Sequence, residues 1–494
     1  MKRLPAAALA LSVAGCMVGP DYQLPTAPAP AAFKELQGWK PGEPRDDADK
    51  GAWWTIYRDP VLDGLEQQVE ISNQTVQEYE AQYRNAVALV AEARASLFPT
   101  IGLTGAVSRT GGGGSSGSSG LTTTTSSNAG ISSTGKTSGP KYSVSSSVSW
   151  DLDVWGRVRR QVESDVAGAQ VSAADLANAK LSAQATLATD YFDLRAEDAL
   201  ADLLRQTTDA YRRALQITQN QYNAGVSSSA DVVTAQAQLQ TTEAQLVGVG
   251  VQRQQFEHAI AMLTGRAPAE LTIAPAPLAS EVPVVPPGLP SALLERRPDI
   301  AAAERAMQQQ NALIGVQVAA YYPDISLSSL GGFAGSPLSQ LFTTGNRVWS
   351  LGASASETLF SGGARGAAVA AARATYDQSV ATYRQTVLTA LQQVEDALSN
   401  LRILEQQAAA QAVAVASARR AVEVTMNTYL AGTAPYTSVI TQQALLLSDQ
   451  QTALSVQQSR LLASVALIEA LGGGWSNAAL PDRSKVMESQ PWLP

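Results

Sequence analysis

The sequence has very few of the side chains on which metal and thiol chemistry depends. Its 494 residues include one histidine, His258, and one cysteine, Cys16. This excludes intramolecular disulfides, Cys/His zinc clusters and the usual Cys–His catalytic pairs. The scattered carboxylates form no constellation of acid, base and nucleophile, so the sequence does not predict an enzyme. His258 lies among polar and small residues and is expected to be a surface residue.

Charge, aromatic content and long apolar runs are also scarce. Charged residues make up 16% of the chain and aromatic residues 6%, whereas ordinary soluble domains have about 25% charged residues. The net charge of −8 argues against a phosphate-binding surface, so no nucleic-acid partner is expected. No run reaches the roughly 18 apolar residues of a transmembrane helix, so any membrane crossing must use strands.

The N-terminus has the features of an export signal. Two basic residues precede an apolar run that ends at Val13, which is typical of a secretory signal. Val13-Ala14-Gly15-Cys16 resembles a bacterial lipobox and predicts cleavage before Cys16, with an N-acyl and S-diacylglycerol lipid on that cysteine and no other cofactor. Met17 in place of Asp favours the outer membrane, by resemblance to lipoprotein sorting. The alternative is an ordinary signal peptide with an incidental cysteine.

Two large stretches of the chain repeat one pattern. Each has the order helix, strand, loop, strand, very long helix, tight turn and second helix, which indicates an internal duplication. The matching pieces are Leu97-Phe98-Pro99 with Tyr321-Tyr322-Pro323, then Tyr222–Gly225 with Tyr429–Gly432 at an offset of 207 residues, and Ala261–Gly265 with Glu469–Gly473 at an offset of 208.

Together, the export signal, the repeat and the Pro-rich stretch predict six segments along the chain. They are a lipoprotein signal peptide (1–15), an N-terminal lipid-anchored extended segment (16–58), a first repeat (59–274), a Pro-rich linker (275–290), a second repeat (291–473) and a C-terminal tail (474–494).

Alternating side chains predict four strands. From Tyr142 to Val154, apolar side chains at most even positions alternate with Ser and Asp at odd positions, which gives one apolar and one polar face. An ordinary antiparallel sheet over a core is one interpretation. The other is a membrane barrel, whose strands need about nine to eleven residues; the export signal, with Trp150 and Trp349 as girdle residues, favours it. The other strands are expected at Trp349–Ser356, Pro99–Ser108 and Pro323–Phe333.

The strand count predicts an oligomer. Four strands cannot close a barrel, and an open edge is not tolerated in hydrocarbon, so several copies must share one barrel. A dimer would supply eight strands and a trimer twelve, and the periodicity does not choose between them. The loop from about Gly105 to Pro140 is nearly all Gly, Ser and Thr, and we expect it to be solvated at the cell surface.

Two very long helices are predicted. Residues 158–222 contain no proline and one glycine, which predicts a continuous helix of about 98 Å. Its small apolar residues form two stripes, so it can pack against a neighbour on each side, as in a tunnel wall. Residues 364–430 have the same character. Each helix should end at a C-cap glycine, Gly225 or Gly432, with both turns at one end of the molecule, far from the strands.

Several motifs carry a family resemblance. Leu293-Leu294-Glu295-Arg296-Arg297-Pro298-Asp299-Ile300 resembles the signature of the TolC-like outer-membrane efflux proteins, in the lipoprotein (NodT-like) branch that serves tripartite RND-type systems. By itself this run is a helix start, with Pro298 and Asp299 in the first turn, and we assign it no chemistry. The likeness continues in family order at Cys16–Tyr22, Asp59–Leu62, Ser149–Arg157, Ala303–Arg305, Ile314-Gly315 and Tyr322–Leu327.

The resemblance implies a mainly α fold with membrane β-structure. Each chain would contribute an internally duplicated long-helix α-barrel and four transmembrane strands, and a homotrimer would form a 12-stranded β-barrel. The implied function is an outer-membrane exit duct in a Gram-negative bacterium, exporting drugs or other small toxic compounds with a periplasmic adaptor and an inner-membrane RND-type transporter. The chain has no Walker motif, so energy would come from the pump. A duct for type I protein secretion is the alternative.

The resemblance also implies gate residues at the periplasmic turns. In the first repeat, Gly225, Ser228 and Asp231 match the family pattern, and a threefold ring of Asp231 would suit cation interaction and repulsive gating. The alternative is that Asp231 caps the second helix.

In the second repeat, relatives often carry Leu and Asp where this chain has Thr437 and Thr441. Threonine cannot form the same seal, so Tyr436 and Val439 are further gate candidates. The residues that flank the turns, where an adaptor would dock, are Tyr222, Gly225, Tyr429 and Gly432; the simpler interpretation is a C-cap glycine with a packing tyrosine.

Overall fold

The structure is a computed structural model and describes residues 17–27, 30, 32–35, 52–109, 140–285 and 293–488. Cys16, most of the Gly/Ser-rich loop and part of the Pro-rich linker lie outside these residues. The chain divides into two compact units. Unit one comprises residues 1–22, 89–165 and 310–375, and unit two comprises residues 23–88, 166–309 and 376–494.

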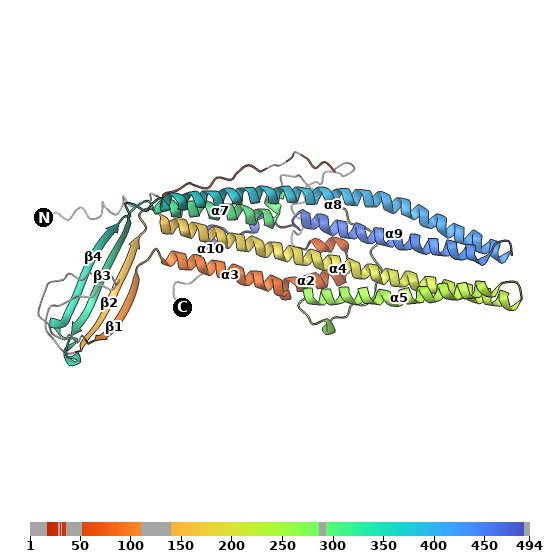
Figure 1. Ribbon diagram of the computed structural model, residues 1–494, viewed down its shortest axis with the longest axis horizontal. Coiled ribbons are helices and arrows are strands. Elements are labelled where there is room, and N and C mark those ends of the chain that lie inside the picture. The colour runs from red at the N-terminus through yellow and green to blue at the C-terminus, as the bar shows by residue number, and fades with distance from the viewer. Residues whose placement is uncertain are drawn as a thin grey trace. The chain divides into compact units, whose positions relative to one another are not determined.

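The described elements follow the order expected for a duplication (Figure 1). Short 3₁₀ turns lie at Trp53–Tyr57 (η1), Pro268–Glu270, Leu338–Gln340, Thr344–Asn346 and Asn477–Ala479. The first half contains α2 (Pro60–Ser72), α3 (Gln74–Ala95), β1 (Thr100–Ser108), β2 (Lys141–Leu152), α4 (Arg157–Asn223) and α5 (Ser229–Leu263). The second half contains α6 (Leu293–Arg296), α7 (Pro298–Ala319), β3 (Asp324–Gly335), β4 (Arg347–Ser356), α8 (Ala364–Leu430), α9 (Tyr436–Ala470) and α10 (Arg483–Glu488).

The helix lengths confirm the duplication. Helices α4 and α8 each have 67 residues, and α5 and α9 each have 35. Helix α8 begins 207 residues after α4, and α9 begins 207 residues after α5. The offset of 208 at the end of the repeats was wrong by one. Gly265 corresponds to Gly472 and not to Gly473. The N–H group of each donates to the carbonyl three residues earlier, Met262 O for Gly265 and Glu469 O for Gly472.

In unit one, the four strands form an antiparallel sheet in the order β1-β2-β3-β4. Gly105 to Ser108 belong to β1 rather than to the predicted loop, because they pair with Val144 to Lys141. Strand β2 ends at Leu152, two residues earlier than predicted. The reason is that the Asp153 carboxylate accepts the Val158 and Arg159 N–H groups at the start of α4, at 2.9 and 3.0 Å.

The register gives the sheet one apolar and one polar face. Paired residues lie on the same face of an antiparallel sheet, so the apolar face carries Ile101, Leu103, Val107, Tyr142, Val144, Val148, Trp150, Leu152, Ile325, Leu327, Phe333, Trp349 and Leu351. The opposite face carries mainly Ser, Thr and Gly, including Ser143, Ser145, Ser147, Ser149, Ser326, Ser328, Ser350, Ser354 and Ser356. The predicted alternation is confirmed across all four strands.

In unit two, the main core lies among α2, α4, α8 and α9. Leu187, Tyr191, Leu398 and Leu461 are fully buried in it, each 0% exposed. Asp59 fixes the start of α2, where its carboxylate accepts the Val61 and Leu62 N–H groups and the Tyr191 hydroxyl. Residues of both predicted stripes of α4, such as Leu187 and Phe192, are buried in this core.

No described helix is both long and apolar enough to cross a membrane. The described residues also bring together no group of three or more His, Cys, Asp or Glu side chains that would suit a metal ion. His258 is exposed on α5.

Candidate functional site

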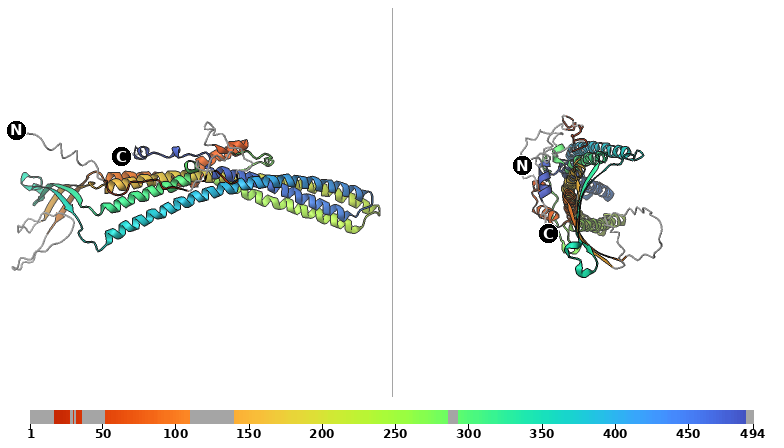
Figure 2. Two further views of the ribbon diagram at one scale, coloured as in Figure 1. Left: turned by 90° about the horizontal axis from the view of Figure 1, so that it is seen from above. Right: turned by 90° about the vertical axis from the view of Figure 1, so that its left-hand side faces the viewer.

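The α4–α5 and α8–α9 turns of unit two lie side by side (Figures 1 and 2). Each long helix ends in a Schellman motif with a glycine at positive φ, +74° at Gly225 and +75° at Gly432. The Gly225 N–H donates to Tyr222 O and the Gly432 N–H donates to Tyr429 O, both at 2.9 Å. The two glycines are therefore helix-ending residues, as the sequence predicts.

Asp231 is held in a capping box at the start of α5. Its N–H donates to Ser228 Oγ at 3.2 Å, and its carboxylate accepts the Ser228 N–H at 3.1 Å. The Ser227 and Ser228 hydroxyls donate to the same carboxylate oxygen, each at 2.9 Å. Burial raises the pKa of Asp231, but the hydrogen bonds from Ser228 and Ser227 outweigh it, so the pKa is lowered overall. The geometry is that of a charged helix cap.

A buried tyrosine pair joins the two turns. The rings of Tyr429 and Tyr436 lie 5.2 Å apart at 50°, packed with Val439, Ala214 and Ala235. Burial raises the pKa of Tyr436 to about 12, although a hydrogen bond with Thr218 opposes the shift. Tyr436 and Val439 are 3% and 0% exposed. Both side chains therefore pack the two turns together.

The remaining turn candidates differ in accessibility. Thr437 and Thr441 are exposed on one face of α9, where Thr441 Oγ1 donates to Thr437 O at 2.9 Å. Tyr222 is 45% exposed, whereas its counterpart Tyr429 is 7% exposed. The duplicated tyrosines are therefore not equivalent: the Tyr222 ring is accessible, and Tyr429 packs inside the chain.

In unit one, a buried arginine holds the N-terminal segment. We call residues 17–22 the N-terminal strap. Arg160, on α4 with 1% of its side chain exposed, donates to Val18 O at 3.2 Å and Gly19 O at 3.3 Å and pairs with Asp21 at 2.9 Å. It also pairs with Glu163 at 2.8 Å. A rigid guanidinium suits this task because one side chain can serve several acceptors.

The strap also fits closely against glycines. A Cβ on Gly19, whose φ is +99°, would lie 2.5 Å from Gly315 Cα on α7, and a Cβ on Gly315 would lie 2.8 Å from Arg160 Cγ. A Cβ on Gly156 would lie 2.7 Å from Met17 Cγ. These positions explain why glycine occurs in three of the motifs that carry the family resemblance. Cys16 itself lies outside the described residues.

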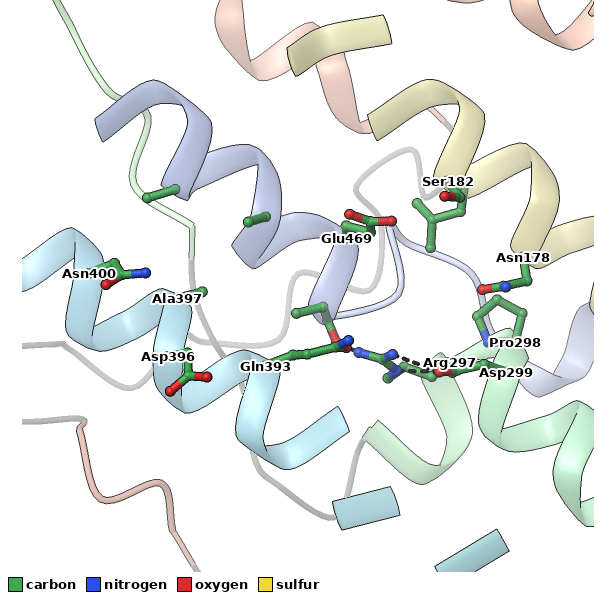
Figure 3. A pocket seen from close by; sticks show the side chains of 14 residues that line it. Asn178, Ser182, Arg297, Pro298, Asp299, Gln393, Asp396, Ala397, Asn400 and Glu469 are labelled. Carbon is green, nitrogen blue, oxygen red and sulfur yellow. Dashed lines mark hydrogen bonds and ion pairs between the residues drawn. The ribbon is translucent and has the colours of Figure 1, made fainter. Parts of the chain in front are cut away.

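The Arg-Arg-Pro-Asp run of unit two joins the start of α7 to the end of α9. Arg297 is 8% exposed, pairs with Asp299 at 2.7 Å and donates to Ala470 O, the last carbonyl of α9, at 2.8 Å (Figure 3). It borders a cavity of about 440 Å³ with Ser182 of α4 and Glu469 of α9 among its lining residues. The run is a helix start, as predicted, and it additionally caps another helix.

Arg160 and Glu66 are among the buried charged residues that sequence reasoning missed. Arg160 lies within a basic run at the start of α4. Nothing in the sequence of this run indicates which of its arginines binds the strap. Glu66 on α2 is 0% exposed, and neither of its carboxyl oxygens has a hydrogen-bond partner. Burial, with a smaller contribution from Asp63, raises the pKa of Glu66 to about 9. Its spacing from Leu62, Leu65 and Val69 on one helix face was the available signal.

Comparison with known proteins shows the family. Residues 65–266 and 289–473 match the family described as Outer membrane efflux protein. The chain belongs to the outer membrane efflux protein family. It is 31% identical to the solvent efflux pump outer membrane protein SrpC of Pseudomonas putida, over 96% of this chain and 98% of that protein. It is 26% identical to the cation efflux system protein CusC of Escherichia coli, over 94% of this chain and 97% of that protein.

Solved structures of this family share the fold. The outer-membrane channel OprN is 28% identical, with a TM-score of 0.83 over 93% of this chain and 100% of that chain. The CmeC outer-membrane channel of Campylobacter jejuni has a TM-score of 0.84 over 96% of this chain at 22% identity, which shows the fold alone. As an outer membrane efflux protein, the chain is an outer-membrane protein and has the predicted fold.

Proposed function

We propose that this chain forms the outer-membrane exit duct of a tripartite efflux pump and assembles as a homotrimer. The observation that carries this proposal is the two-faced sheet. Its apolar face presents Ile101, Leu103 and Trp349 at 75–79% exposure, as lipid contact requires, and its serine face suits a water-filled lumen. Among the described residues, β1 and β4 each lack a partner on one side, so neighbouring copies would close a barrel of twelve strands.

Two partners would bind the part of the chain that lies in the periplasm. A periplasmic adaptor would dock at the turns, where Tyr222, Thr437 and Thr441 are exposed. An inner-membrane RND-type transporter would supply the energy. We further propose that Cys16 carries the acyl anchor; the strap that begins at Met17 supports this, because Arg160 holds it in the unit that contains the sheet.

The cargo would be small toxic compounds, but its identity is not a property of this fold. Similar proteins of this family are named for toluene, antibiotic, solvent and cation efflux. Proteins of one fold thus serve different cargoes, which supports a pump that selects the compound and a duct that conducts it. The same names favour small compounds over the secreted proteins of a type I system.

The test is reconstitution of efflux in a Gram-negative host that lacks its own outer-membrane efflux duct. The chain would be expressed alone and together with an RND-type pump and adaptor encoded near its gene. Export of a fluorescent dye is expected to return only when all three proteins are present. Dye export that is the same with and without this chain would contradict the proposed function.

A further inference from the structure

Two adjacent apolar side chains in unit one are almost fully exposed. Leu359 and Phe360, in the junction between β4 and α8, are 95% and 87% exposed. Single exposed apolar residues are normal, but a Leu-Phe pair beside an unpaired sheet edge exposes apolar surface without an evident function. The charges beside the pair are already neutralised within the chain, because Glu357 and Arg365 form an ion pair at 2.6 Å.

The corresponding junction of the first repeat, between β2 and α4, is covered. Trp155 stacks on Tyr322, with ring centroids 4.8 Å apart at 24°, and its Nε1–H donates to Pro323 O at 2.9 Å. Tyr322 and Pro323 form the junction between α7 and β3. Inside the chain, therefore, the strand-to-helix junction of one repeat packs against the helix-to-strand junction of the next repeat.

Backbone geometry shows that these junctions are duplicated. At the strand-to-helix junctions, Arg160 N donates to Gly156 O at 2.8 Å and Ala367 N donates to Gly363 O at 3.0 Å, and both glycines have positive φ. At the helix-to-strand junctions, the N–H groups of Tyr322 and Phe98 each donate to the carbonyl three residues earlier, at 3.1 and 3.0 Å, and each residue precedes a proline. Phe98 and Pro99 thus correspond to Tyr322 and Pro323.

The second strand-to-helix junction cannot meet this counterpart within its own chain. Leu359 and Phe360 follow β4, whereas Phe98 and Pro99 precede β1, and β1 and β4 are the opposite edges of the sheet. The two junctions come together only where β4 of one copy lies beside β1 of the next.

We propose that Leu359 and Phe360 pack against Phe98 and Pro99 of a neighbouring copy, as the intermolecular counterpart of the Trp155–Tyr322 stack. The proposal rests on the homotrimer of the proposed function and names the residues of its interface. The Phe360 side chain, unlike the Trp155 indole, has no N–H group to donate, so the contact is apolar. Ser361 and Gly362 separate Phe360 from Gly363, which gives this junction the additional length to span two chains. Phe98 is 50% exposed and has surface available for the contact.

A short bismaleimide cross-linker tests the contact in the full-length, detergent-purified protein. Cys16 is the only natural cysteine and is present in every variant, so wild type controls for it. The Phe98→Cys/Phe360→Cys pair is expected to give covalent dimers and trimers on a boiled denaturing gel, and neither single variant should do so. The Phe98→Cys/Phe342→Cys pair is the matched control, because Phe342 is 67% exposed but precedes β4 instead of following it.

The alternative to a neighbouring copy is that lipid covers Leu359 and Phe360. Absence of cross-linking in the Phe98/Phe360 pair, with an intact trimer on an unheated gel, would overturn the contact and leave the exit duct in place. Absence of a wild-type trimer would contradict the proposed function instead. As a second measurement, Phe360→Ala should lower the temperature at which the trimer dissociates, by roughly 2 °C, while Ile71→Ala, at a residue 75% exposed on α2, should not. Equal temperatures for the two variants would also overturn the contact.

Discussion

The effect of Glu66 on the free energy of unfolding depends on pH. Its pKa of about 9 in the folded chain, against 4.5 as the ordinary value, means that the folded state holds one more proton between these pH values. The free energy of unfolding therefore falls as pH rises, by up to about 1.4 kcal/mol per pH unit. Glu66→Gln should remove this slope and raise stability at pH 8 more than at pH 5 in denaturant melts.

Glu80→Gln provides the control. Glu80 is exposed on α3, so this variant replaces one solvated side chain with another and should leave the pH slope unchanged. Equal pH slopes in wild type and the Glu66→Gln variant would show that the folded state does not keep Glu66 protonated.

Asp231 combines a cap with a charge, and the two roles can be separated. Its lowered pKa keeps the carboxylate ionised at neutral pH, and the stability that it contributes is lost only as pH falls below its ordinary value of 3.8. Ser228→Ala and Asp231→Ala should each cost about 1 kcal/mol through the cap. If threefold symmetry places Asp231 near the aperture, only Asp231→Ala should raise single-channel conductance or sensitivity to vancomycin.

The Ser228→Ala variant is decisive for that assignment because it keeps the charge and loses the cap. Equal conductance in wild type and both variants would reduce Asp231 to a helix cap.

One added methyl group would disturb the packing of the N-terminal strap. Gly19→Ala combines a φ of +99° with a Cβ placed 2.5 Å from Gly315 Cα, so the strap must shift. We expect a loss of about 2 kcal/mol in stability and faster cleavage near the strap in limited proteolysis. Gly64→Ala on α2 meets nothing within 4 Å, and it should be neutral or slightly stabilising because alanine favours helix. Similar cleavage rates in both variants would contradict the close fit.

Removing the guanidinium tests the same element through its hydrogen bonds. Arg160→Met should cost about 3 kcal/mol, because Glu163, with 18% of its side chain exposed, loses its partner and two strap carbonyls lose their donor. Arg160→Lys should recover little, since one ammonium group cannot reach all of these acceptors. Full recovery of stability by lysine would show that charge alone holds the strap.

The elements differ in how far their sequences predict them. The long helices were predictable because proline is absent from them and a glycine at positive φ ends each, and α8 has the predicted bounds, Ala364–Leu430. The strands were predictable because most of their apolar side chains alternate with Ser, Thr and Gly. The strap was not, because Arg160 and its partners Val18, Gly19 and Asp21 are more than 130 residues apart. The burial of Tyr436 and Val439 was not predictable either, since periodicity does not specify which face of α9 meets its neighbours.

At the level of the whole molecule, both the sheet and the Leu359–Phe360 junction are incomplete in one chain. An apolar face at 69–79% exposure on Ile101, Leu103 and Val107, with open edges at β1 and β4, requires lipid on one side and other copies at the edges. In the proposed trimer, neighbours on two sides of each long helix would account for both the low charge and the two stripes of small residues.

The most direct test of this account is the mass of the full-length chain after extraction in mild detergent, measured by native mass spectrometry. The account predicts a species of three copies that survives in unheated SDS and separates into single chains on boiling. A single chain that remains monomeric in mild detergent across the accessible concentration range would contradict it.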